Sequence, residues 1–475
     1  MAPRIATDKS DVEGLEMTQS TLKTYTKAQI SVSDLPLIII EGAVFDISSL
    51  MAPGRHPGGL AVLNEVLRSD ATDQFMNSHP LWTRQLLTQY KVGECLDWVV
   101  SDADTDFRKI RADLEASGAF STGSSAMYYY RSFSRIFALA AIVLGALAFS
   151  TSTLVHIAIG AVALGLFWQQ IAFVGHDLGH NGVSGSLEID SLRGLLIGPA
   201  LTGISFSWWK STHNAHHIAT NSATGDPDVQ HTPLLALSEH FFESLWSTFH
   251  KKRMGFGSIA RIVVSHQHLF FYPLMFFARW NLYFQGWCKL ILEAKTRWSA
   301  AESMAIIFFW TWVIGLTLAV GRTESTFLAA FPARLLFLIT SNGVAGILNV
   351  QISLSHFAEP TIRGRSTDSG VSFLEAQLRG TMNISVPPEQ DYTFGGLQFQ
   401  IEHHLFPRLP AEKLRSVQPL IRKLAEKHNI PYKTMTFIEA NVRLFESLQE
   451  IAASAHKLDG KVLDQRVIDA IMLQA

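Results

Sequence analysis

The feature that most constrains this fold is a stretch of 40 residues, 136–175, that contains no Asp, Glu, Lys or Arg. As one α-helix it would be about 60 Å long, whereas the hydrocarbon core of a bilayer is about 30 Å thick. The polar residues 150–153 divide the stretch near its middle. It therefore predicts two membrane-spanning helices joined by a tight turn, at about 134–151 and 154–175.

A second pair of apolar segments without formal charge predicts two more spans, at about 303–321 and 335–355. Two further apolar segments, 194–209 and 269–277, are too short to cross a bilayer, and Pro273 interrupts the second. We expect both of these to lie at the membrane surface or to re-enter it.

Four crossings place both ends of the chain, and the region between the second and third spans, on one side of the membrane. Most Lys and Arg residues lie in these regions. Because basic residues concentrate on the cytosolic side, that side is expected to be cytosolic.

Composition excludes several classes of protein. Hydrophobic residues make up 48% of the 475 and charged residues 17%, whereas soluble proteins have about 25% charged residues. The formal net charge of -2 provides no basic surface for nucleic acid. The two cysteines cannot form a disulfide framework, so the 18 histidines are the unusual component.

Residues 31–93 have the pattern of a small soluble domain. A strand, turn and strand at 37–47 precede the sequence His56-Pro-Gly-Gly, and His79 follows. Two histidines can ligate one haem iron from opposite faces, and glycines allow the backbone to pass close to the macrocycle. Because both axial positions would then be filled, such an iron only transfers electrons, one at a time.

Three short segments repeat a spacing that puts histidines on one helix face, i and i+3 or i+4. A separate histidine, His356, stands where the fourth predicted span returns to the cytosolic side. The three boxes are His176 and His180; His213, His216 and His217; and Gln400, His403 and His404.

The number of these side chains indicates two metal ions, because a structural zinc takes four ligands and a hydrolytic zinc about three. With a one-electron haem donor in the same chain, iron is the expected metal. Reduction of dioxygen to water takes four electrons, of which a pair of C–H bonds supplies two and the haem domain two. This combination predicts desaturation or hydroxylation of a hydrocarbon.

Two groups of residues near the boxes each have two open interpretations. The polar group either orients the imidazoles or caps helices and loops. It comprises Asp177, Asn214, Asp226, Asp228 and Glu402. The aromatic group either lines a substrate path or forms an interfacial belt. It comprises Trp168, Phe173, Phe206, Trp208 and Trp209.

The segment around His56 and His79 resembles the cytochrome b5 domain, and residues from about 30 to 450 resemble the front-end desaturases. The likeness rests on HDLGH, WWKSTHNAHH, GDPDVQHTPLLA and GGLQFQIEHHLFPRLP, with Gln400 in place of the first histidine of the last box. The chain looks most similar to plant-type sphingoid long-chain base Δ8-desaturases, with Δ6 and Δ5 acyl-lipid desaturases next.

The resemblance implies an α-helical membrane domain with four transmembrane helices and a cytosolic histidine-rich helical cap, preceded by a small α+β cytochrome b5-like domain. The expected boundaries are a disordered tail at 1–25, the haem-binding domain at 26–96, a connector at 97–132, the membrane desaturase domain at 133–450 and a C-terminal tail at 451–475.

The resemblance also assigns roles to residues. His56 and His79 are expected to bind haem b, and the eight histidines of the boxes and position 356 to bind two non-haem irons as the catalytic site, with Gln400 as a companion. Some relatives in the wider group place an Asn one turn before the histidine of the last span, where Ile352 stands here. Asn349 and Gln351 are the alternatives for that contact.

The implied reaction is the dioxygen-dependent introduction of a double bond into a long hydrocarbon chain of a lipid, with a sphingoid base at Δ8 favoured over a Δ6 or Δ5 acyl-lipid or acyl-CoA substrate. Electrons from NAD(P)H are expected through a separate cytochrome b5 reductase, because no Gly-rich dinucleotide fingerprint is present. The expected location is the endoplasmic reticulum membrane, with both termini and the active site cytosolic.

Three other functions remain open at this stage. A lipid acyl-chain hydroxylase could use the same metal site and would add oxygen instead of removing two hydrogens. A metal transporter would place its ligands near mid-membrane, whereas these boxes lie at the ends of the spans. A haem-bearing membrane anchor for electron transfer would leave the boxes without a role.

Replacing His56 with Ala tests the electron-donor role of the first domain. We expect activity to be lost, because the haem iron loses an axial ligand, while the iron of the membrane domain is retained. Iron and haem content are measured beside lipid products in cells that lack free cytochrome b5. Retained turnover in those cells would contradict the role.

Overall fold

The computed structural model describes residues 23–120, 125–148, 153–293, 296–368 and 370–472. Four of its helices or helix pairs are long and apolar enough to span a membrane: Ala126–Ala148 (α6), Leu154–Gly179 (α7), Ser299–Ala319 (α12), and Phe327–Ala345 with Ile347–Leu354 (α13 and α14). The expected four-span helical domain behind a small α+β domain is confirmed. The first helix begins earlier than position 134, because it continues through Arg131 and Arg135 at its predicted cytosolic end.

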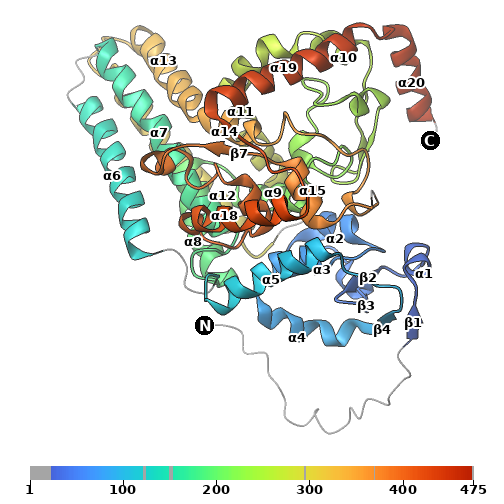
Figure 1. Cartoon of the computed structure of the whole chain (residues 1–475). Helices are drawn as coiled ribbons and strands as arrows, with labels where there is room; N and C mark the ends of the chain where they lie inside the picture. Colours follow the sequence, from blue (N-terminus) through green and yellow to red (C-terminus); the bar gives the residue numbers. More distant parts are fainter. Residues whose placement is uncertain (1–22, 121–124, 149–152, 294–295, 369, 473–475) are drawn as a thin grey trace.

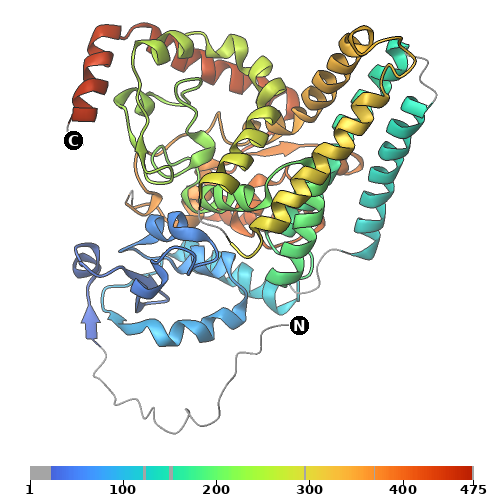
Figure 2. The ribbon, with the colours of Figure 1, turned by 180° about the vertical axis from the view of Figure 1, so that it is seen from behind.

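The helix α7 is the centre of the membrane bundle and packs against α6, α13 and α8 (Leu187–Thr202). In Figure 1, α6, α7 and α13 stand together, and the N-terminal domain lies below them. The view from behind shows the same arrangement (Figure 2). The helical cap therefore lies between the spans and the N-terminal domain; it comprises α9 (Phe206–Ala219), α15 (Phe373–Gly380), α17 (Gln400–Leu405) and α18 (Ala411–Lys427) with their connecting segments.

Glycines allow two close helix contacts in this bundle. A Cβ at Gly165 of α7 would lie 2.6 Å from the carbonyl oxygen of Ser341 and 2.6 Å from Cβ of Val344 on α13. A Cβ at Gly346, between α13 and α14, would lie 2.6 Å from the carbonyl oxygen of Met275. The interruption at Gly346 thus accommodates a neighbouring helix and separates α14 from α13.

One expected surface segment, 269–277, is instead part of a continuous 26-residue helix, α11 (Gln267–Leu292). Pro273 lies inside it and does not end it. A proline removes one backbone hydrogen bond, and here Phe271 and Met275 on either side are buried against neighbouring elements, which keep the helix intact. Segment 194–209 divides between α8 and α9 (Phe206–Ala219), with Gly203 in the left-handed conformation between them.

Two arginines that depart from the distribution of basic residues have structural partners at the predicted far end of the bundle. The guanidinium of Arg322 donates to the carbonyl oxygen of Ala148, at 2.8 Å, and that of Arg334 to the carbonyl of Val320, at 3.1 Å. Both acceptors lie at helix C-termini, where a cation is favoured by the exposed carbonyls. These two charges therefore have a local explanation.

The N-terminal domain is built on a four-stranded sheet in the order β1–β4–β3–β2, comprising Lys23–Tyr25, Lys91–Cys95, Ala43–Asp46 and Leu37–Ile40. The strands β2 and β3 pair antiparallel through the predicted turn, in which Glu41 and Gly42 have positive φ. Helices α2 (Gly59–Val66) and α3 (Thr72–Ser78) cover the sheet with an apolar core that includes Phe45, Val62 and Met76.

The structure describes an element near each of three expected boundaries. The strand β1 begins at Lys23 because it pairs in parallel with β4, so the sheet starts within the expected tail; residues 1–22 lie outside the described part. The connector contains α5 (Asp102–Ala116), which packs against the cap. The helix α19 (Phe437–His456) runs across the expected boundary at 450, and α20 (Gly460–Met472) follows it. Both helices are amphipathic and pack against neighbouring helices of the desaturase domain.

Gly165→Ala tests the close contact of α7 with α13. We expect it to lower the stability of the detergent-solubilised protein by about 1–3 kcal/mol, because the new methyl group must displace backbone. Gly145→Ala on α6 is the matched control, since a Cβ there meets no atom within 4 Å. Thermal unfolding measures both, and equal melting temperatures would contradict this account of the contact.

Candidate functional site

Four parts of the chain bring the histidine boxes together at one end of the bundle. His176 lies in the last turn of α7, and His180 is the C-terminal cap residue of that helix. The second box lies on α9, whose first turn is capped by Ser205. The third lies on α17 (Gln400–Leu405), and His356 follows α14.

The imidazoles form two groups, and within each the potential ligand atoms lie within 4.8 Å of one another. The first comprises His176, His180, His213 and His403, and the second His216, His356 and His404. His217 lies between them, with its ring centre 4.7 Å from that of His403 and 4.2 Å from that of His404. All eight histidines singled out from the sequence therefore meet in one site.

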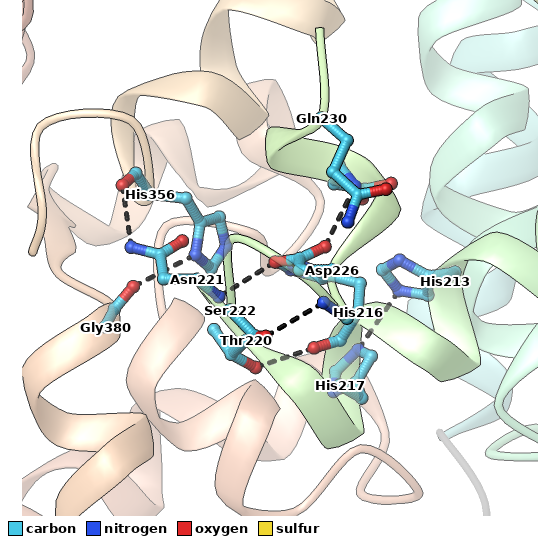
Figure 3. Close-up of polar contacts among 12 residues, drawn as sticks. His213, His216, His217, Thr220, Asn221, Ser222, Asp226, Gln230, His356 and Gly380 are labelled. Atoms are coloured by element: carbon cyan, nitrogen blue, oxygen red, sulfur yellow. Dashed lines mark hydrogen bonds and ion pairs between the residues drawn. The ribbon is translucent and has the colours of Figure 1, made fainter. Parts of the chain in front are cut away.

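Hydrogen bonds from Nδ1 orient the second group, and Figure 3 shows those of His216 and His356. Nδ1 of His216 lies 2.8 Å from a carboxylate oxygen of Asp226, and Nδ1 of His356 lies 3.3 Å from the carbonyl oxygen of Gly380. Nδ1 of His404 lies 3.0 Å from Oε1 of Gln377. A ring that donates from Nδ1 keeps the Nε2 lone pair for a metal, which is the usual arrangement behind metal-bound histidines.

Burial controls the protonation of the site. It lowers the pKa of six imidazoles, with repulsion among the rings adding to the effect, so they are neutral at neutral pH and able to bind a metal. These are His180, His213, His217, His356, His403 and His404. Burial also opposes protonation of His216, but the charges of Asp226 and Asp228 outweigh it and raise its pKa to about 9.

Several buried ring nitrogens have no hydrogen-bond partner among the described residues. They are Nε2 of His176, His180, His356, His403 and His404, and Nδ1 of His217. A buried polar atom without a partner costs free energy, and a cation shared by such lone pairs removes that cost. The donor set, all nitrogen and divided into two groups, therefore fits redox-active metal ions such as iron.

The polar and the aromatic residues near the boxes include side chains that support the imidazoles and others that do not. Asp226 orients His216 and also caps a short helix, whereas Glu402 is bonded to Tyr432 and Asn383 instead of an imidazole. Trp209 stacks on His213 with ring centres 4.5 Å apart, and Gly179 leaves room for it, since a Cβ there would lie 1.9 Å from the indole.

The alternatives to the missing asparagine contact are both engaged elsewhere. The amide of Gln351 accepts a hydrogen bond from Gln169 and donates to the carbonyl oxygen of Thr393. Asn349 donates to the carbonyl oxygen of Met275 at 3.5 Å. Gln400 is buried close to the ring of His356.

The haem ligands predicted from the sequence also lie together. The ring centres of His56 and His79 are 5.9 Å apart. An imidazole–metal bond is about 2 Å long, so two imidazoles on opposite sides of one iron have ring centres about 6 Å apart. Nδ1 of His79 bonds the carbonyl oxygen of Phe75 at 3.0 Å, and burial lowers the pKa of His79 to about 4. The pair therefore fits a haem between its rings.

The haem domain is docked on the metal-binding cap. Its helix α2 packs against α9, which carries the second histidine box. The hydroxyl of Thr248 donates to the buried carboxylate of Glu65 at 2.7 Å, and Arg365 donates to the carbonyl oxygen of Leu67 at 2.9 Å. Arg408, four residues after His404, donates to the carbonyl oxygen of His79.

Two family models match the sequence. The model described as fatty acid desaturase covers residues 151–436, and the cytochrome b5-like haem/steroid binding domain covers residues 19–96. The chain belongs to the fatty acid desaturase family. It is a front-end desaturase, an oxidoreductase that acts on lipid and carries a fused cytochrome b5 domain. Haem binding follows from the one domain and iron from the other.

Three similar proteins illustrate the range of this desaturase's relatives. A Delta(8)-fatty-acid desaturase of Helianthus annuus is 39% identical over 89% of each chain. An acyl-lipid (9-3)-desaturase of Borago officinalis is 36% identical over 89% of this chain and 91% of its own. A Delta 8-(E)-sphingolipid desaturase of Kluyveromyces lactis is 34% identical over 76% of this chain and 61% of its own.

Sequence reasoning missed several residues that the fold brings to the desaturase site. Gln377 and Gly380 support His404 and His356 from α15 (Phe373–Gly380), which carries no histidine. Glu65 and Arg408 join the two domains. No spacing relates these residues to the boxes, so no signal in a single sequence distinguishes them from ordinary polar residues.

Asp226→Asn tests the support of His216. We expect the affinity for iron to fall about 10 to 100-fold, because the ring of His216 is less well oriented and less basic without the carboxylate. Asp228→Asn is the matched comparison on the same loop, since Asp228 acts on His216 through its charge alone, whereas Asp226 also accepts the hydrogen bond from Nδ1 of His216. Iron content after graded chelation measures both, and equal retention in the two variants would contradict the role of Asp226.

Proposed function

We propose that this desaturase introduces the Δ8 double bond into the long-chain base of a sphingolipid, with two irons held by the eight clustered histidines. The observation that supports two metal ions is the division of the imidazoles into two groups on either side of His217. The Δ8 position is supported by the names of plant and fungal relatives, and the sphingolipid substrate by the names of the fungal ones.

His176, His180, His213 and His403 would hold one metal ion, and His216, His356 and His404 the other, with His217 available to either. When bound, the irons supply activation of dioxygen and removal of two hydrogen atoms from the hydrocarbon chain. His216 keeps its Nδ1 proton toward Asp226. We propose that Gln400, which stands in place of the first histidine of the last box, is a hydrogen-bonding companion of the metal ligands beside the ring of His356.

The protein's own contribution is a dry, fixed environment. His216, His217, His403 and His404 are each less than 5% exposed, and the rings of Trp209 and Phe206 cover the site from α9. Exclusion of water protects a reactive oxidant from side reactions. A long apolar substrate would enter from the bilayer, and the aromatic side chains beside the first two boxes are proposed as the walls of its path.

Electrons are proposed to come from NAD(P)H through a separate cytochrome b5 reductase to a haem b held by His56 and His79. Each turnover needs two electrons and two protons in addition to the two hydrogen atoms of the substrate, and dioxygen leaves as two waters. We propose an endoplasmic reticulum location with both termini and the metal site cytosolic, because basic residues concentrate on that side.

A second substrate class is favoured by one specific observation. The acyl-lipid (9-3)-desaturase of borage matches about as much of the chain as the Δ8 enzymes do. A fatty acyl chain is therefore the alternative substrate. Hydroxylation of an acyl chain is the alternative reaction at the same site.

Expression in a host that lacks polyunsaturated lipids and Δ8 long-chain bases separates these possibilities. We expect a long-chain base whose mass is lower by two hydrogens, and no new product from His404→Ala, which removes a ring of the second group. Mass spectrometry of fatty acids and long-chain bases in parallel measures the outcome. New unsaturated fatty acids alone would reject the sphingoid substrate, and a product heavier by one oxygen would reject desaturation.

A further inference from the structure

Both proposed haem ligands are connected to the metal-binding cap by short paths. On the side of His56, helix α2 starts at Gly59 and carries Glu65, whose carboxylate is 4% exposed. The carboxyl group of Glu65 packs closely against Gly225, since a Cβ there would lie 2.7 Å from it. The next residue, Asp226, holds the ring of His216. The haem domain therefore contacts the loop that supports the second group of histidines.

The path on the side of His79 is shorter and contains a cation. Nη1 of Arg408 donates to the carbonyl oxygen of His79 at 2.9 Å. Arg408 lies in the turn between α17 and α18 (Ala411–Lys427), only four residues after His404. The adjoining Phe406 and Leu409 are buried in the cap, which fixes this turn.

The contact made by Arg408 is unlike those of other arginines in the cap. Arg415 pairs with Asp391 and Arg379 with Glu375. Within the described ranges no carboxylate forms an ion pair with Arg408, which donates a hydrogen bond to the carbonyl oxygen of His79. Glu115 acts on the guanidinium only at longer range, so the positive charge of Arg408 is not neutralised by a direct contact and acts on the haem ligand.

We propose that Arg408 is the positioning residue that couples the haem of the cytochrome b5 domain to the metal site of the cap. This inference rests on the proposed function. In each transfer one ferrous haem is oxidised to ferric and one ferric ion of the cap is reduced to ferrous; two transfers, supplied by the external reductase, serve one double bond. Arg408 holds His79 beside the segment that carries His403 and His404.

A positive charge beside the haem ligand also favours the reduced haem, because ferrous haem carries one positive charge fewer. Removal of the charge should lower the reduction potential of the haem and thus increase the driving force for transfer to the cap. Slower electron transfer in spite of that greater driving force would therefore identify a loss of coupling between the haem and the metal site. If Arg408 only stabilised the fold, its loss would not slow transfer while the haem spectrum stayed unchanged.

The test uses full-length holoenzyme with haem and iron, under anaerobic conditions and without substrate. Photoreduced flavin delivers electrons to the haem, and the decay of ferrous haem absorbance reports transfer to the cap. Iron-depleted enzyme gives the background. The variants are Arg408→Ala, Arg408→Gln and Arg408→Lys, with Arg443→Ala as the matched control, since Arg443 bonds Glu450 on α19 away from the haem domain.

We expect transfer to be about tenfold slower in Arg408→Ala and Arg408→Gln, as loss of a charge-assisted hydrogen bond would cause, with a lowered haem potential. Arg408→Lys should recover part of the rate and most of the potential, and Arg443→Ala should match the unmodified enzyme. A normal rate in either neutral variant that retains haem and iron would overturn the proposal. Decay in unmodified enzyme no faster than in iron-depleted enzyme would instead reject the proposed electron route itself.

Discussion

The structure depends on the burial of imidazole nitrogens at the ends of apolar helices. Eight rings from four elements are packed within a few ångströms, although each alone would prefer water or a proton. Burial keeps most of them neutral, and carbonyl, amide and carboxylate oxygens occupy several of their outer nitrogens. What remains is a set of inward lone pairs that a cation would satisfy, so folding and metal binding are coupled in this desaturase.

The membrane bundle explains how the rings reach one place. The helix α7 carries His176 out of the bundle core, and the interruption at Gly346 separates α13 from α14, which leads to His356. The other two boxes lie on cap helices that pack on this end of the bundle, with α9 beside α8 and α11. The spans therefore act as a rigid base for the site, and the cap closes it from the predicted cytosolic side.

Fusion of the haem domain gives the cap a second function. The helix α2 of the haem domain packs on α9, which carries three histidines of the metal site. The helix α9 therefore contacts the haem domain and also forms part of the metal site. The hydrogen bonds from Thr248 to Glu65 and from Arg408 to the carbonyl oxygen of His79 hold the domain in this orientation. A donor held in this way need not find its acceptor by diffusion, which replaces an encounter between two proteins with a contact within one chain.

Charge-free length and i, i+3 and i+4 spacing predicted the four spans and the histidine boxes, and the strand pattern with His56-Pro-Gly-Gly and His79 predicted the haem-ligand pair, because these are local properties of the chain. The sequence could not determine that α11 continues through Pro273, since neighbouring helices outweigh the local effect of the proline. Nor could it identify Gln377, Gly380, Glu65 or Arg408, which lie far along the chain from the residues they contact. Only the tertiary structure decided these contacts, because the order of residues in a chain carries no distance between segments that meet after folding.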